Sequence, residues 1–203
     1  MELIRVDNVQ KTYKNGVVAL YDFNLSIQKG EFVFVIGASG SGKSTLIKML
    51  YREEKPDKGS IFIGGINVAR LKNRKVYILR RKLGVVFQDF KLLPKLTVFE
   101  NVAFAMEVFG YDKREIQQRV VIARAIVNRP KLLICDEPTG NLDPDTSMEI
   151  MRVLENINNL GTTIIMATHD REIVNKMKKR VIWIEDGRLK KDYEKGTYYN
   201  ERY

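Results

Sequence analysis

The sequence predicts a protein of the α/β class, with a mostly parallel, buried sheet and an antiparallel β unit near its N-terminus. Short apolar runs with the composition of strands covered on both faces occur at residues 31–36, 131–135 and 162–167. A glycine-rich turn and a helical stretch follow the first run. Two strand-like segments, residues 3–6 and 25–27, lie on either side of Asn15-Gly16, a turn typical of antiparallel neighbours.

The glycine-rich turn at residues 37–44 fits the pattern G-x-x-x-x-G-K-[ST]. Glycines let the backbone N–H groups of such a loop converge on phosphate oxygens, and the dipole of the following helix adds to the attraction. Lys43 is expected to reach the β- and γ-phosphates, and Ser44 to hold Mg²⁺. The alternative is a turn that contains Lys-Ser by chance, which the flanking strand and helix disfavour. The residues expected to bind nucleotide here are Gly37, Ser39, Gly40, Ser41, Gly42, Lys43, Ser44 and Thr45.

The composition suits one soluble α/β domain: 203 residues, of which 44% are apolar and 30% are charged. No apolar run approaches the roughly 20 residues of a membrane span, and the first residues do not resemble a signal peptide. Cys135 is the single cysteine, which suits a reducing cytoplasm. The net charge of +10 suits an anionic partner, but no basic stripe is interleaved with aromatic residues, so we expect no nucleic acid partner.

Tyr13 lies just before the Asn15-Gly16 turn and has two interpretations. Its ring either stacks on a base or packs across the strands, and without the phosphate loop the second would be favoured. After the first helix we expect a turn at residues 55–59, a strand at 60–63 and a turn at Gly64-Gly65. A short basic helix at 77–83 and a buried strand at 84–87 follow.

Gln88 follows that strand, where a glutamine beside a nucleotide can place its amide oxygen near Mg²⁺ or the attacking water. Taken alone it is an ordinary polar loop residue. Residues 97–100 form a capping box that opens a helix with an apolar face. The preceding loop, residues 90–94, is unusually apolar and is a candidate docking surface.

The apolar run at residues 131–135 ends in two carboxylates, Asp136 and Glu137. In α/β sheets, ligands bind at this end of the strands. Asp136 is expected to meet Mg²⁺ and Glu137 to act as the general base toward water. The alternative, an acidic helix N-cap, is disfavoured beside a phosphate loop.

Asp143 and Pro144 have the residue types of an N-cap and a first helical position, and predict another helix. The strand at 162–167 leads to His169, which lies at the same sheet edge as the carboxylates and within reach of a γ-phosphate. A lone histidine is otherwise more often structural. Residues 181–189 predict a hairpin, and the polar tail from Lys191 is expected to be loosely held.

The motifs that carry a family resemblance are Tyr13, the loop at 37–45, Gln88, Asp136-Glu137, residues 141–143 and His169. Together they resemble the nucleotide-binding domain of ABC ATPases over nearly the whole chain. The resemblance implies a P-loop NTPase (RecA-like) core, ATP or ADP with Mg²⁺ as cofactors, and a homodimer when ATP is bound. It implies that Tyr13 stacks on adenine, that Gln88 senses Mg²⁺ and that His169 is a catalytic switch. Asp143 would lie in the loop that communicates across the dimer.

Within the family, four stretches resemble the ATPases that act with the membrane protein FtsX in bacterial cell division: residues 50–53, 87–94, 101–108 and 136–144. ATPases of lipoprotein release and macrolide export share much of this sequence and remain the alternative. The resemblance implies an integral membrane partner (FtsX-like) and a peripheral location at the cytoplasmic face of the membrane. The partner's helix would dock near Gln88 and residues 90–94.

One departure from the family pattern concerns its signature motif, Leu-Ser-Gly-Gly followed by Gln or Glu. The residues that should follow the motif begin at Gln117, and those of the preceding helical subdomain end at Ile116. Either the segment is deleted, or it exists but is disordered and the sequence omits it. We expect the second, and hence a Cα separation between Ile116 and Gln117 well beyond 3.8 Å. By the resemblance, the motif of one cassette closes over the γ-phosphate held by the other.

We expect a single ABC-type domain over residues 1–203, with the antiparallel β subdomain mainly within 1–70, the core at 30–50 and 84–190, and a truncated helical subdomain at about 95–118. Two competing functions are a soluble ABC ATPase that acts on nucleic acid and a nucleotide-binding module without turnover. A GTPase is disfavoured, because no Asn-Lys-x-Asp base-reading motif occurs.

Overall fold

The structure is a computed structural model, and it describes residues 1–87 and 130–196. A four-stranded antiparallel sheet has the order β2-β1-β4-β5, and a six-stranded sheet has the order β10-β9-β3-β8-β7-β6. The strands of the first sheet are β1 (Glu2–Thr12), β2 (Val18–Gln28), β4 (Lys58–Ile63) and β5 (Ile66–Asn67). Those of the second are β3 (Phe32–Ile36), β6 (Leu83–Val86), β7 (Leu132–Asp136), β8 (Thr163–Ala167), β9 (Arg180–Glu185) and β10 (Arg188–Tyr193).

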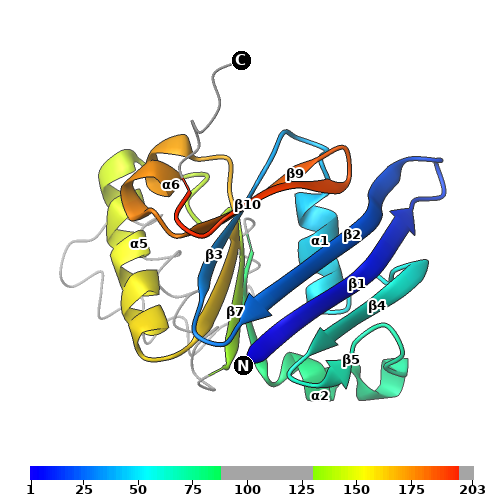
Figure 1. Ribbon diagram of the computed structural model, residues 1–203. Helices are drawn as coiled ribbons and strands as arrows, with labels where there is room; N and C mark the ends of the chain where they lie inside the picture. The colour runs from blue at the N-terminus through cyan, green and yellow to red at the C-terminus, as the bar shows by residue number, and fades with distance from the viewer. Residues whose placement is uncertain (88–129, 197–203) are drawn as a thin grey trace, which may run out of the picture.

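The six-stranded sheet is parallel except for β10, which pairs antiparallel with β9. Helix α1 (Lys43–Leu50) lies between the two sheets, and α5 (Pro144–Asn159) and α6 (Arg171–Met177) cover the other face of the six-stranded sheet (Figure 1). The short segments η1 (Asn73–Lys75) and α2 (Val76–Arg80) lead into β6. The predicted fold class, an α/β core with an N-terminal antiparallel sheet, is confirmed.

The core is divided by the alternation of side chains along the buried strands. In β3, Val33 and Val35 face α1 and the antiparallel sheet, whereas Phe32, Phe34 and Ile36 pack toward α5 and α6. Both sets are buried, which is why the sequence of β3 is continuously apolar.

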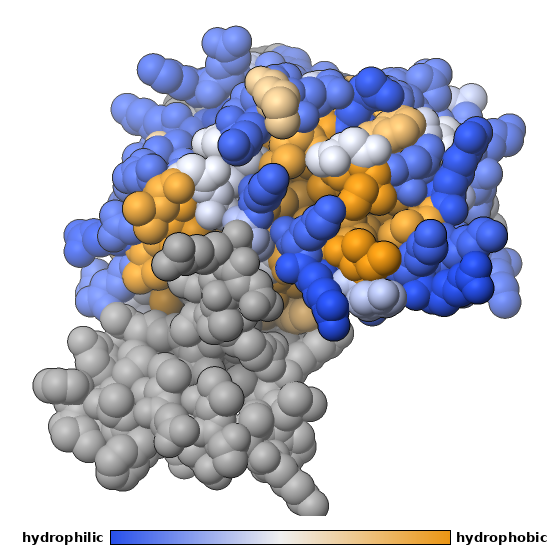
Figure 2. Space-filling model, turned by 90° about the horizontal axis from the view of Figure 1, so that it is seen from below, coloured by the Kyte–Doolittle hydropathy of each residue, from blue (hydrophilic) through white to orange (hydrophobic). Residues whose placement is uncertain are grey.

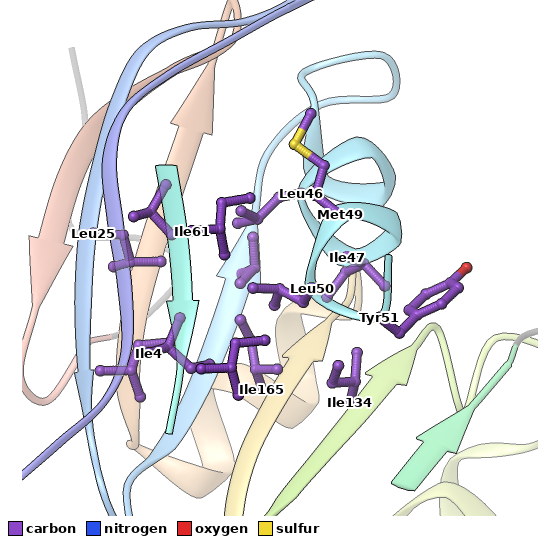
Figure 3. Packing of buried hydrophobic residues seen from close by; sticks show 14 of the residues in the cluster. Ile4, Leu25, Leu46, Ile47, Met49, Leu50, Tyr51, Ile61, Ile134 and Ile165 are labelled. Carbon is purple, nitrogen blue, oxygen red and sulfur yellow. The ribbon is translucent and has the colours of Figure 1, made fainter. Parts of the chain in front are cut away.

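Helix α1 is held by apolar contacts from both sheets, as Figure 3 shows. Its side chains Leu46, Ile47, Met49 and Leu50 lie between Ile4, Leu25 and Ile61 of the antiparallel sheet and Ile134 and Ile165 of the parallel one. All four helix side chains are fully buried. This packing fixes the start of α1, and with it the loop that precedes the helix.

The parallel strands give the molecule two chemically different edges. Their carboxyl ends carry the phosphate loop after β3, the carboxylates at the end of β7 and His169 after β8. Two lysines lie at their amino ends: Lys82 just before β6 and Lys131 just before β7.

The predicted elements within the described residues are present with shifted ends, and two features differ. The basic helix predicted at 77–83 ends at Arg80, because Leu83 already pairs with Leu132 in the sheet. The prediction of a loose tail from Lys191 is wrong up to residue 196. Strand β10 continues to Tyr193, where both carboxylate oxygens of Asp192 accept hydrogen bonds from Arg180 at 2.9 and 2.7 Å.

Several predictions fall outside the described residues. These are Gln88, the apolar loop at 90–94, the capping box at 97–100 and the separation of Ile116 from Gln117. In the 203-residue sequence Gln117 directly follows Ile116, and the expectation that the sequence omits a segment there stays a prediction.

Candidate nucleotide-binding site

The phosphate loop joins β3 to α1 and needs glycine at both of its ends. Gly37 has a φ of 151° and Gly42 a φ of 110°, values that L side chains rarely adopt. A Cβ atom at Gly37 would collide with the carbonyl oxygen of Ile184 in β9, and one at Gly42 with that of Ala19 in β2. The loop is therefore braced from behind by both sheets.

Lys43 lies inside this loop and is only 9% exposed. Its Nζ atom donates hydrogen bonds to the carbonyl oxygens of Gly37 at 2.7 Å and Ala38 at 2.9 Å. Burial lowers the pKa of Lys43, while the nearby carboxylates of Glu137 and Asp136 act in the opposite direction. The ammonium group is thus positioned where the phosphates of a nucleotide would lie in the loop.

Asp136 and Glu137 are placed by the end of β7, beside the phosphate loop. The backbone N–H of Glu137 donates to the carbonyl oxygen of Ala167 at 3.0 Å, which extends the pairing with β8 by one residue. Burial raises the pKa of Asp136, and the adjacent Glu137 raises it further, whereas Lys48 and Lys43 lower it. The structure therefore brings together the lysine and the two carboxylates that the sequence placed far apart.

Glu137 holds an unusual backbone conformation and contacts His169. Its φ is 49°, in the left-handed region that costs energy for a residue with a side chain. Its Oε1 atom lies 2.9 Å from Nδ1 of His169, and its Oε2 atom lies 3.4 Å from the backbone nitrogen of that residue. The His169 side chain is 68% exposed and faces solvent at the carboxyl edge of the sheet, whereas the Glu137 side chain is only 13% exposed.

Tyr13 lies beside the first turn of α1, although it comes from the β1–β2 connection. Its hydroxyl group lies 3.2 Å from Oγ1 of Thr45, and Nζ of Lys11 lies 5.4 Å from the centre of its ring. The ring is partly buried. This position beside the phosphate loop suits the predicted base-stacking role.

Asp143 caps helix α5 as predicted, with Pro144 at the first helical position. Its Oδ1 atom accepts hydrogen bonds from the backbone N–H groups of Asp145 at 3.1 Å and Thr146 at 3.0 Å. The hydrogen bond from Thr146 is the largest cause that lowers the pKa of Asp143. The cap fixes the chain between Glu137 and α5.

The residues of the loop fit a nucleotide triphosphate. Oγ of Ser41 is buried and has no hydrogen-bond partner among the described residues, in a loop where Gly37 and Gly42 leave no room for a side chain. Within the described residues no group of three His, Cys, Asp or Glu could hold a metal ion. Ser44 and Asp136 supply two oxygen donors, which suits Mg²⁺ because that ion takes much of its coordination from phosphates and water. Gln88, the third predicted ligand, lies outside the described residues.

Sequence reasoning missed the part that the β9–β10 hairpin plays behind the loop. The N–H of Gly187 donates to the carbonyl oxygen of Ser41 at 3.1 Å, and its carbonyl accepts from the N–H of Tyr21 at 2.9 Å. A cavity of about 380 Å³ lies beside this contact and is lined by loop residues 37–41 together with Trp183 and Asp186 of the hairpin. The Asp186-Gly187 turn was visible in the sequence, but its position against the loop depends on the sheet order.

Comparison with known proteins gives a family, relatives and a solved neighbour. The family model described as "ABC transporter" matches residues 20–140. The cell division ATP-binding protein FtsE of Bacillus subtilis is 54% identical, over 97% of this chain and 98% of that protein. FtsE of Streptococcus pneumoniae is 51% identical, over 98% of each chain. The dimeric ATP-binding cassette MJ0796 with ADP and Pi is 33% identical, with a TM-score of 0.83, and the match covers 97% of this chain and 100% of that one.

The alignments also bear on the missing segment. They run over 224 and 226 residues for the two FtsE proteins, more than the 203 residues of this chain. Nearly all of each relative is aligned, so the relatives carry positions that have no counterpart here. This agrees with a segment of the relatives that this sequence lacks.

Proposed function

The chain belongs to the ABC transporter ATPase family, and from this we propose that it is the ATP-binding and hydrolysing subunit of a membrane complex in bacterial cell division. Relatives of 54% and 51% identity are named cell division ATP-binding proteins, which favours this role over lipoprotein release or macrolide export. The observation that carries the ATPase proposal is the single site that Lys43, Asp136 and Glu137 share.

The roles of the site residues follow from their chemistry. The loop N–H groups and Lys43 bind the phosphates, and the ring of Tyr13 stacks on adenine. Ser44, Asp136 and Gln88 would hold Mg²⁺, which would neutralise phosphate charge when bound. Glu137 orients the attacking water and accepts its proton, and His169 holds Glu137 in place while its own ring faces the γ-phosphate.

We assign the chain to the cytoplasmic face of the membrane, with an FtsX-like integral membrane partner and a second cassette as neighbours. No helix in the part of the chain that the structure describes is long and apolar enough to cross a membrane. The partner's helix would dock near residues 90–94. Co-purification with the partner after Phe90→Asp or Leu93→Asp tests this docking, and unchanged association would contradict it.

The hydrolytic role is best tested with only one working site in the dimer. This chain is mixed with a relative that carries the Leu-Ser-Gly-Gly motif and whose own catalytic glutamate has been changed to glutamine. Mg²⁺-dependent ATP hydrolysis by the mixture then reports on this chain. Glu137→Gln is expected to lower the rate by about 10²-fold or more, because the water loses its general base.

ATP binding by Glu137→Gln is the control, since the carboxylate is not needed to hold the phosphates. We expect the affinity for ATP to stay within a few-fold of the original chain. Hydrolysis as fast with Glu137→Gln as without it would exclude Glu137 as the base and refute the proposed site.

A further inference from the structure

A strongly basic segment lies at the amino edge of the parallel sheet, away from the nucleotide site. Residues 58–88 contain no Asp or Glu. Six cationic side chains of this segment are exposed and have no ion pair among the described residues: Arg70, Lys72, Arg74, Lys75, Arg81 and Lys82. A cluster of six exposed cations attracts an anionic surface.

The same segment exposes apolar side chains next to its charges. In α2, Val76 and Leu79 anchor the helix in the core, whereas Tyr77 and Ile78 are 55% and 38% exposed. The guanidinium carbon of Arg81 lies 5.2 Å from the centre of the Tyr77 ring, so charge and aromatic surface face the same side. Basic residues mixed with exposed aromatic and aliphatic ones are typical of segments that lie in a membrane interface.

An apolar groove continues this surface and has lysines on its rim. The groove has a volume of about 80 Å³ and is lined by apolar side chains of β1, α2 and the β4–β5 hairpin, together with Lys82 and Lys131. These two lysines begin the neighbouring strands β6 and β7. Figure 2, which looks at the molecule from below, shows apolar side chains here with hydrophilic ones around them.

This face lies opposite the site where nucleotide binds. Lys82 and Lys131 precede parallel strands, whereas Asp136 ends one of them and the phosphate loop follows another. A ligand at the amino edge therefore leaves the carboxyl edge open, and both can be occupied together.

We propose that the amino edge, formed by residues 70–82 and Lys131, binds the head groups of anionic membrane lipids. The cations meet the lipid phosphates, and Tyr77 and Ile78 enter the interface beside the apolar groove. A bilayer fits this surface better than nucleic acid does, because nucleic acid offers no apolar layer to Ile78 and the groove. The inference does not depend on ATP hydrolysis, and it gives the chain a membrane contact of its own.

Sedimentation of the full chain with protein-free vesicles tests the proposal. Binding is expected to vesicles of phosphatidylcholine mixed with phosphatidylglycerol, to be absent with phosphatidylcholine alone and to weaken as salt is added. The variant Lys82→Gln with Lys131→Gln is expected to bind about 25-fold more weakly, from roughly fivefold for each cation removed. The matched control, Lys14→Gln with Arg152→Gln, removes the same charge from exposed positions elsewhere and should bind as the original chain does.

Three results would contradict lipid binding at the amino edge. The proposal fails if the original chain ignores anionic vesicles, or if the two double variants bind them equally well. It also fails if the Lys82 and Lys131 changes weaken only the binding of a single-stranded DNA oligonucleotide, which would make the edge a nucleic acid surface. Thermal unfolding of each variant shows that it is folded, and ATP binding measured in parallel separates failure here from failure of the proposed ATPase role.

Discussion

At the scale of single residues, the candidate site depends on backbone positions that ordinary side chains do not favour. Glu137 adopts a φ of 49°, and the hydrogen bond from its N–H to Ala167 together with the contact to His169 holds it there. Strain of this kind persists only where surrounding contacts fix it. The carboxylate is thereby directed toward the sheet edge where Lys43 lies, rather than along β7.

Tyr13 offers a test of how the base is held. Tyr13→Ala is expected to weaken ATP binding by about 10- to 100-fold, because stacking on an aromatic ring contributes about 1–3 kcal/mol per base. The Tyr13→Phe variant should bind ATP nearly as tightly as the original chain does. It loses the hydroxyl group that contacts Thr45 but keeps the ring face that would stack on the base. Titration with a fluorescent ATP analogue measures both. Equal affinities for the alanine and phenylalanine variants would assign Tyr13 to packing alone.

The carboxylate of Asp136, a predicted Mg²⁺ ligand, lowers the stability of the folded state. Its raised pKa means that the folded state disfavours the carboxylate, so this group destabilises the fold at neutral pH and stops doing so as pH falls through the raised pKa. Asp136→Asn should therefore raise the Tm at neutral pH while it weakens Mg²⁺-dependent ATP binding. Because part of the carboxylate reaches solvent, the expected gain is modest, about 1 kcal/mol or 2–4 °C.

The pH dependence gives this prediction its control. The difference in Tm between Asp136→Asn and the original chain should shrink as pH is lowered, because protonation removes the same charge. Asp22→Asn makes the same chemical change at an exposed site and should leave the Tm unchanged at every pH. A Tm that falls with Asp136→Asn at neutral pH would contradict the argument.

At the scale of elements, helix α5 depends on one carboxylate at its start. The pKa of Asp143 is lowered by the hydrogen bonds it accepts, so its stabilising effect is present above the ordinary pKa and is lost as pH falls through the lowered one. Asp143→Ala should lower the Tm at neutral pH, and the difference should vanish in acid. Asp143→Asn keeps a hydrogen-bond acceptor but has no charge. The stabilisation from the asparagine cap should therefore not change with pH. Thermal unfolding followed by circular dichroism measures all three.

The elements that the sequence predicted are those with a strong local pattern. The run from Leu132 to Cys135 is apolar because β7 is covered on both faces. Asp143 and Pro144 have the residue types of a helix start and predict α5. Helix α6 has only seven residues with Ile173 and Val174 buried, too few for a helical period to stand out. Its one local signal is Asp170, which caps it.

Strand β10 was missed beyond its first residues for a different reason. Its sequence, from Arg188 to Tyr193, alternates between partly buried and exposed positions with charged side chains at most of them. It is held by its backbone pairing with β9 and by the ion pair of Asp192 with Arg180, which also bonds Glu31 at 2.8 Å. Such a long-range pair has no signature in a single sequence.

At the scale of the whole molecule, the convergence of the site was predictable because parallel strands place their carboxyl ends together. Lys43 follows β3 and Asp136 ends β7, so strand direction alone predicts one edge. The order of the strands was not predictable from local patterns. This order sets Gly187 behind the phosphate loop and puts Lys82 beside Lys131 at the opposite edge.

The departure from the family pattern at Ile116 and Gln117 bears on the activity of the whole chain. The described residues keep the phosphate loop and its carboxylates, so ATP binding should be intact. The motif that would complete a second cassette's site is absent from the sequence. Two copies of this chain therefore lack the donors that stabilise the transferred phosphate, and removing a single donor of that kind costs about 10²- to 10³-fold in rate.

We therefore expect the chain alone to bind ATP and to hydrolyse it at least about 10²-fold more slowly than a version with the relatives' segment inserted after Ile116. Steady-state phosphate release compares the two, and ATP affinity should differ little because Lys43 and its loop are unchanged. An insertion of equal length whose Leu-Ser-Gly-Gly is replaced by four alanines is the control, and should stay slow. If the alanine control hydrolyses ATP as fast as the complete segment does, then the missing length of chain, and not the missing motif, limits the rate of hydrolysis.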